Sequence, residues 1–222
     1  MGTGRHQQCF GFETNPGPEA AADPNFCLPR SETTLAERLK GLGYATGVFG
    51  KWHIGYRPEL QPTQRGFDEF FGFLSGANDY LPGGRRMDKI LCGTEVVEES
   101  EYLTDAFGRE AVAFIEKHQQ HPFFLYLPFN AVHAPLQSVD KYLQRFPDLK
   151  DPKRRTFAAM TAAMDDNVGR VLSTWRRLSL EEDTLVFFLS DNGGPTEQTT
   201  SGNGPLRGFK GQTWEGAFAS RS

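Results

Sequence analysis

The stretch from residue 44 to residue 55, YATGVFGKWHIG, decides the fold. Its first half, residues 44–49, is short and rich in β-branched and aromatic side chains, which is typical of a strand. Lys51 and His53 follow at once, so polar groups stand at the carboxyl end of that strand. Strand ends of this kind are where α/β proteins bind ligands. The stretch therefore predicts a strand and a site together.

Two further apolar runs end in the same way. Residues 123–127 (FFLYL) and residues 185–189 (LVFFL) are continuous apolar segments, which predicts buried strands of a parallel sheet. Polar residues follow each run, namely Asn130 and His133 after the first and Asp191 and Asn192 after the second. Because the carboxyl ends of parallel strands share one edge of the sheet, we expect these side chains to lie near Lys51 and His53.

Helical patterns precede the three predicted strands. They cover residues 33–43, 104–118 and 153–178, and the first has a possible capping box at Thr34 and Glu37. This alternation predicts an α/β fold with a mainly parallel sheet and helices on both faces. Residues 1–30 are expected to run extended over a surface, and residues 56–100 are expected to form loops and short strands that cover the sheet.

Composition narrows the class of protein. The chain has 222 residues, enough for one large domain or two small ones, and it is 38% hydrophobic and 23% charged. Its formal charge is -4 and it has no long basic run, so a nucleic-acid partner is not expected. No apolar stretch approaches the roughly 18 residues that span a bilayer. The three cysteines form no C-x-x-C pair, which argues against a disulfide framework and a structural zinc site.

The polar residues at the predicted sheet edge suit one kind of chemistry. Lys supplies a point charge, His donates or accepts a proton, and carboxylate and amide oxygens ligate calcium or magnesium. An oxyanion held beside a hard divalent cation would fit such a group. The residues therefore favour hydrolysis of an anionic ester.

Five ordered motifs resemble the sulfatases of the alkaline-phosphatase-like superfamily, in the branch of the arylsulfatases and N-acetylgalactosamine sulfatases. GKWHIG resembles the family signature G-K-W-H-L-G. The other four motifs, in chain order, are HAP at residues 133–135, MDDNVG at 164–169, SDNG at 190–193 and KGQTWEG at 210–216. The resemblance covers nearly the whole chain and implies the sulfatase α/β core as its fold.

The resemblance implies a role for six residues. Asp191 and Asn192 would ligate a divalent cation, usually Ca²⁺, and Lys51 and Lys210 would hold the sulfate or the nucleophile. His133 would contact the sulfate near the leaving oxygen, and His53 would help the catalytic aldehyde hydrate to turn over. In the family that hydrate is formylglycine, made from the cysteine of C-x-P-x-R.

The chain departs from the family pattern at both ends. The nucleophile motif precedes a T-G-R segment in the family, and here T-G-R is residues 3–5, so formylglycine is expected upstream of this chain. Cys27 and Pro29 have the right spacing, but Arg30 comes one position early. We therefore expect residues 1–222 to be a sulfatase catalytic domain truncated at both ends, without the smaller C-terminal subdomain and inactive alone.

The expected function is removal of sulfate from a carbohydrate or aryl sulfate ester. Two alternatives stay open: a phosphodiesterase or phosphonate hydrolase of the same superfamily, and a non-catalytic chain that binds a sulfated glycan through Lys51, His53, His133 and Lys210. The resemblance suggests a periplasmic, secreted or lysosomal location. The sequence indicates neither the particular substrate nor the oligomeric state.

Overall fold

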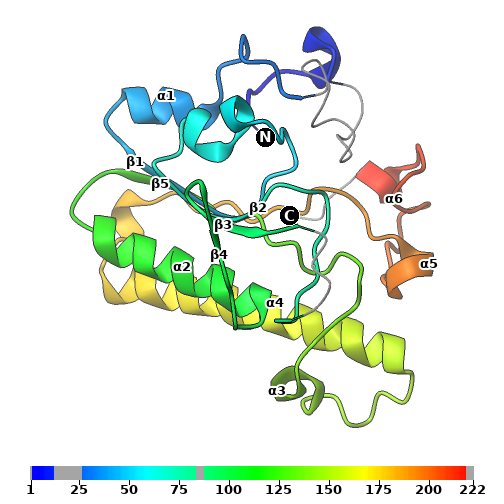
Figure 1. Cartoon of the computed structure of the whole chain (residues 1–222). Coiled ribbons are helices and arrows are strands. Elements are labelled where there is room, and N and C mark those ends of the chain that lie inside the picture. The colour runs from blue at the N-terminus through cyan, green and yellow to red at the C-terminus, as the bar shows by residue number, and fades with distance from the viewer. Residues whose placement is uncertain (1, 13–26, 84–87, 219–222) are drawn as a thin grey trace.

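The computed structural model describes residues 2–12, 27–83 and 88–218. Within these residues one sheet has the strand order β4-β3-β2-β1-β5 (Figure 1). The strands are β1 (Ala45–Lys51), β2 (Glu69–Phe73), β3 (Ile90–Cys92), β4 (Glu95–Val97) and β5 (Phe123–Tyr126). The α-helices are α1 (Leu35–Gly41), α2 (Leu103–His118), α3 (Asp140–Leu143), α4 (Pro152–Arg177), α5 (Thr196–Thr199) and α6 (Glu215–Phe218).

The sheet is mixed rather than parallel throughout. β1 pairs in parallel with β2 on one side and with β5 on the other, so these three strands end at the same edge. β3 runs antiparallel to β2, and β4 runs antiparallel to β3. The predicted parallel pairing is therefore confirmed for two of the three predicted strands, β1 and β5, and β2 is a further parallel strand. The short β3–β4 hairpin extends the sheet beyond β2.

The three predicted long helices are present close to their expected limits. Thr34 caps α1, because its hydroxyl accepts the backbone N–H of Glu37 while the Glu37 carboxylate accepts the Thr34 N–H. Asp151 caps α4 by accepting the N–H of Arg154. These caps satisfy amide groups that have no partner inside the helix.

Helices cover both faces of the sheet (Figure 1). On one face Ala36 of α1 packs in a cluster with Val48 and Phe70 of the sheet. On the other face α2 packs against β1 and β2, with Phe107 and Phe114 buried beside Phe49. Burying such large apolar side chains contributes roughly 1.5–3 kcal/mol each, so the two clusters fix the sheet between the helices.

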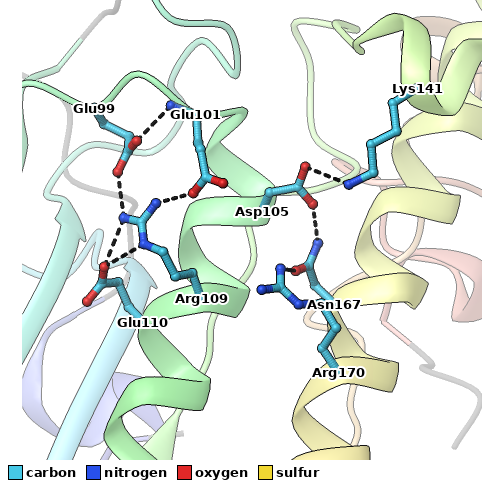
Figure 2. A network of polar contacts seen from close by, with 8 residues as sticks. All are labelled: Glu99, Glu101, Asp105, Arg109, Glu110, Lys141, Asn167 and Arg170. Carbon is cyan, nitrogen blue, oxygen red and sulfur yellow. Dashed lines mark hydrogen bonds and ion pairs between the residues drawn. The ribbon is translucent and has the colours of Figure 1, made fainter.

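Buried polar contacts join α2 to α4. Asp105 of α2 accepts a hydrogen bond from the Asn167 amide of α4 at 2.7 Å, and Lys141 of α3 lies 3.4 Å from the same carboxylate (Figure 2). The Tyr142 hydroxyl also donates to Asp105, at 2.6 Å. Asn167 belongs to the MDDNVG motif, so this motif contributes a structural link between helices.

The strand predicted for residues 185–189 is wrong. The segment has no regular secondary structure, and all five side chains are exposed, from 50% for Leu189 to 86% for Leu185. An apolar run becomes a buried strand only where a neighbouring strand and a covering layer receive it. Among the described residues β5 is the last strand on that side of the sheet, so this segment is not paired within it.

The prediction that residues 56–100 form loops and short strands covering the sheet is also wrong in part. β2 lies inside the sheet between β1 and β3, with Phe70, Phe71 and Phe73 buried, rather than in a covering layer. Of the expected surface excursion over residues 1–30, residues 13–26 lie outside the described part. No helix within the described ranges is both long and apolar enough to cross a membrane.

Candidate active site

Lys51 stands at the carboxyl end of β1, close to the segment that follows β5. Its backbone N–H donates to the Pro128 carbonyl at 2.9 Å. Gly50 precedes it with φ at +141°, and a Cβ there would lie 2.2 Å from the Pro128 oxygen. Only glycine allows this approach, so the Gly-Lys pair brings the two strand ends together.

The half-buried Lys51 ammonium lies among other charged groups. Burial lowers the pKa of Lys51, the charge of Lys210 lowers it further, and the charge of Asp191 opposes both effects. Lys51, Lys210 and Asp191 are therefore close enough for their charges to interact, although they come from three separate parts of the chain. Two cations held near one another gain stability when an anion binds between them.

His133 joins the same group of charges. Burial lowers its pKa, the hydrogen bond to Ala134 opposes that change, and Lys210 and Lys51 lower the pKa again. Its Nδ1 lies 2.7 Å from the Ala134 carbonyl oxygen, so Nδ1 carries the proton and Nε2 has the lone pair in the neutral ring. Its backbone is held as well, because its carbonyl accepts the Tyr80 hydroxyl at 2.9 Å.

Asp191 and Asn192 lie on a loop that is tied to the end of the described chain. The Ser190 hydroxyl donates to the Asn192 carbonyl at 2.9 Å, and the Gly193 N–H donates to the Ala217 carbonyl at 3.0 Å. A Cβ on Gly193 would lie 1.7 Å from a backbone oxygen, so this position requires glycine. The SDNG motif therefore packs against the EGA segment at residues 215–217.

Asn203 holds the loop of Asp191 beside the loop of Lys210. Its amide nitrogen donates to the carbonyls of Gly194 and Gly208, at 2.9 and 3.0 Å, and its amide oxygen accepts the Gly194 N–H. Sequence reasoning did not single out Asn203, because a lone asparagine in a loop carries no motif. Its three hydrogen bonds hold the backbone at Gly194 close to the backbone at Gly208, and so hold the loops of Asp191 and Lys210 side by side.

The structure places His53 two residues after the end of β1. Its backbone N–H donates to the Leu74 carbonyl at 3.0 Å, and its φ is +57°, in the left-handed region. Few residues other than glycine adopt that conformation, so the local fold constrains His53 strongly. Its role in a reaction stays a prediction.

Asn130 and Tyr126 also lie near the site. The sequence predicted that Asn130 stands at this edge of the sheet but gave it no role, and it did not single out Tyr126. Asn130 follows β5, is 4% exposed, and neither of its amide atoms has a hydrogen-bond partner among the described residues. Burial raises the pKa of Tyr126, and the charge of Asp191 raises it further, so Asp191 lies near the end of β5. A buried amide without a partner costs about 1–3 kcal/mol, which points to a bound water or ligand beside Asn130.

The donor atoms present would fit part of a cation shell. The Asp191 carboxylate and the Asn192 amide supply oxygen ligands of the kind that calcium prefers, but calcium takes about six to eight of them. The described residues hold no group of three or more His, Cys, Asp or Glu side chains that could bind a metal. The two residues thus match the expected chemistry and make up only part of a shell.

These features define an α/β protein with a cationic site at the carboxyl edge of its parallel strands. The family described as Sulfatase matches residues 1–220, and the chain belongs to this family. Mouse arylsulfatase J is 36% identical over 208 residues, which cover 88% of this chain and 34% of that protein. Pig N-acetylgalactosamine-6-sulfatase is 34% identical over 211 residues, which cover 86% of this chain and 39% of that protein.

A solved structure agrees with the family assignment. The crystal structure of Ps i-CgsB in complex with k-i-k-neocarrahexaose superposes with a TM-score of 0.90 at 35% identity, and the match covers 99% of this chain and 52% of that one. The predicted sulfatase resemblance is thereby confirmed. The chain spans less than two fifths of the two curated relatives and about half of the solved protein.

Proposed function

We propose that this chain carries the sulfate-binding part of a sulfuric ester hydrolase that acts on a carbohydrate or aryl sulfate. One observation supports this most: Lys210 and Asp191, which come from distant parts of the sequence, lie close enough to Lys51 and His133 for their charges to shift the pKa values of these two residues. A sulfate ester is a compact monoanion that would sit between the two ammonium groups.

Each of these residues has a distinct task in the proposed reaction. Lys51 and Lys210 would hold the sulfuryl oxygens, where charge develops as the ester bond breaks. The Nε2 atom of His133, once protonated, would donate its proton to the leaving oxygen. His53 is the proposed residue for turnover of the nucleophile. Asp191 and Asn192 would hold a divalent cation, which supplies further charge stabilisation when bound.

The nucleophile is not assigned within residues 1–222. The motif C-x-P-x-R does not occur in the sequence, and the nearest approach, Cys27-Leu28-Pro29-Arg30, places the cysteine in a buried position with 4% exposure. We therefore expect the 222-residue chain to bind a sulfate ester without turning it over. We also propose, from the family resemblance, that turnover requires a formylglycine nucleophile and that the protein is exported.

Binding without turnover would equally describe a non-catalytic chain that recognises a sulfated glycan. The missing C-x-P-x-R motif is the observation that favours this second function. The two functions share the same contacts at Lys51 and Lys210. They differ only in whether a form of the protein that carries the nucleophile releases sulfate.

Ligand-observed NMR on the purified chain tests the proposal. With calcium present, 4-nitrophenyl sulfate should give saturable binding that inorganic sulfate displaces, and bis(4-nitrophenyl) phosphate should bind less. Preference for the diester would favour the phosphodiesterase alternative. If neither ester binds, both the sulfatase function and the glycan-binding function are contradicted for this chain.

A further inference from the structure

His53 packs against a glycine that leaves no room for a side chain. A Cβ on Gly76 would lie 2.7 Å from both Cε1 and Nε2 of the His53 ring and 3.3 Å from its Cδ2. Real Cβ atoms essentially never come so close to another heavy atom. The Gly76 backbone therefore lies directly against the imidazole.

The turn that contains Gly76 is connected to His53 through the backbone. β1 and β2 are parallel neighbours, and their pairing continues past the ends of the strands. There the backbone N–H of Trp52 donates to the Phe73 carbonyl, and that of His53 donates to the Leu74 carbonyl, both at 3.0 Å. The His53 ring thus leaves β1 toward the turn that follows β2. His53 itself has a φ of +57°, in the left-handed region.

Asp88 holds that turn in place. One carboxylate oxygen, Oδ2, accepts the backbone N–H groups of Leu74 and Ser75, at 3.0 and 2.9 Å. The Asn78 amide closes the other side by donating to the Asp88 carbonyl at 3.1 Å. Hydrogen bonds to a charged acceptor are stronger than neutral ones, so this carboxylate fixes the two amides that precede Gly76.

We propose that Gly76 and Asp88 are positioning residues for His53: Asp88 fixes the turn after β2, and the bare backbone of Gly76 sets where the imidazole lies. This proposal rests on the proposed function, because a positioning role requires that His53 takes part in turnover.

The test is NMR of the imidazole rings in the 222-residue chain labelled at histidine, with His53 assigned by comparison with His53→Gln. In Gly76→Ala the His53 ring signals should move further than any other histidine signal. The matched control is Gly41→Ala, at a helical position where a Cβ meets nothing within 4 Å. That control should leave His53 unchanged.

Asp88 supplies the second arm of the test. Asp88→Ala removes the acceptor and should displace the His53 signals, whereas Asp88→Asn keeps one oxygen that can accept both amides and should restore them. Thermal unfolding checks that each variant folds, and the Asp88 pair decides the matter if Gly76→Ala does not fold. An unmoved His53 in folded Gly76→Ala, or equal displacement in both Asp88 variants, would overturn the proposal. Neither readout uses sulfate, so the result is separate from that of the proposed function.

Discussion

At the scale of single residues, the charge of the half-buried Lys51 side chain is subject to opposing electrostatic effects. Burial and the charge of Lys210 both disfavour its charged form, and Asp191 compensates only in part. An anion bound beside Lys51 would relieve this electrostatic penalty. The lowered pKa of Lys51 is therefore consistent with the proposed binding of a sulfate ester beside it.

His133 should make sulfate binding depend on pH. In the chain without ligand its pKa is lowered from 6.5, first by burial and then by Lys210 and Lys51. A bound anion raises that pKa, so binding takes up a proton, and the affinity for sulfate should increase as the pH falls through the region below about 6.5. Calorimetric titration with sulfate between about pH 5 and about pH 7.5 measures this increase.

The histidine responsible can be identified by substitution. His133→Gln should remove most of the pH dependence, while His121→Gln, at an exposed position beyond α2, should keep it. If the affinity rises equally in wild type and His133→Gln, the proton is taken up elsewhere and the assignment fails.

At the scale of elements, we expect the hydrogen bond between α2 and α4 to stabilise the folded chain. Asn167 donates to Asp105, and its amide oxygen is so close to α2 that a Cβ on Gly108 would lie 2.1 Å from it. Asn167→Ala leaves a buried carboxylate with one donor fewer, and we expect the free energy of unfolding to fall by about 2 kcal/mol. Urea unfolding measures the loss, and Thr161→Ala, an exposed position of the same helix, is the control. A loss no larger than that of the control would show that the link is not stabilising.

The apolar segment 185–189 should respond quite differently to substitution. Phe187 is 79% exposed, so Phe187→Ser should change the free energy of unfolding by less than about 0.5 kcal/mol, whereas Phe107→Ala in the core should cost about 3–5 kcal/mol. An exposed run of five apolar residues favours association, so Phe187→Ser should also lower light scattering at high protein concentration. A large loss of stability in Phe187→Ser would mean that the segment is packed.

The same segment shows where prediction from sequence succeeds and where it fails. The limits of α1 and α4 depend on local signals, such as the Thr34 capping box and the Asp151 cap, and these are readable from the sequence. Whether an apolar run is buried depends on its neighbours: residues 123–126 gain a partner in β1, and residues 185–189 gain none among the described residues. β2 escaped prediction because its Phe and Gly residues resemble a loop until β1 and β3 are placed beside it.

The site was predictable to the extent that a motif carried it. Lys51, His133, Asp191 and Lys210 stand in quoted motifs, and the structure brings their charges together. Asn203, Gly76 and Asp88 belong to no motif, because their contributions are backbone contacts that arise only when distant loops meet. Such supporting residues can be found from the structure alone.

At the scale of the whole molecule, the chain belongs to the sulfatase family, and its fold brings together the charged groups that we propose bind a sulfate ester. The match to a solved structure at a TM-score of 0.90 covers 99% of this chain and about half of the other. The cationic groups lie at the carboxyl edge of β1 and β5, and two oxygen donors lie on the loop at Asp191. Binding of the oxyanion is thus the property that residues 1–222 should show by themselves.

Calorimetric titration of the purified chain with sodium sulfate tests this central claim most directly. Wild type should show saturable binding that weakens as sodium chloride is added, because added salt screens the charges. Lys51→Met should abolish it, and Lys117→Met, an exposed lysine paired with Glu69, should retain it. Sulfate binding that is absent in wild type, or unchanged in Lys51→Met, would contradict the account.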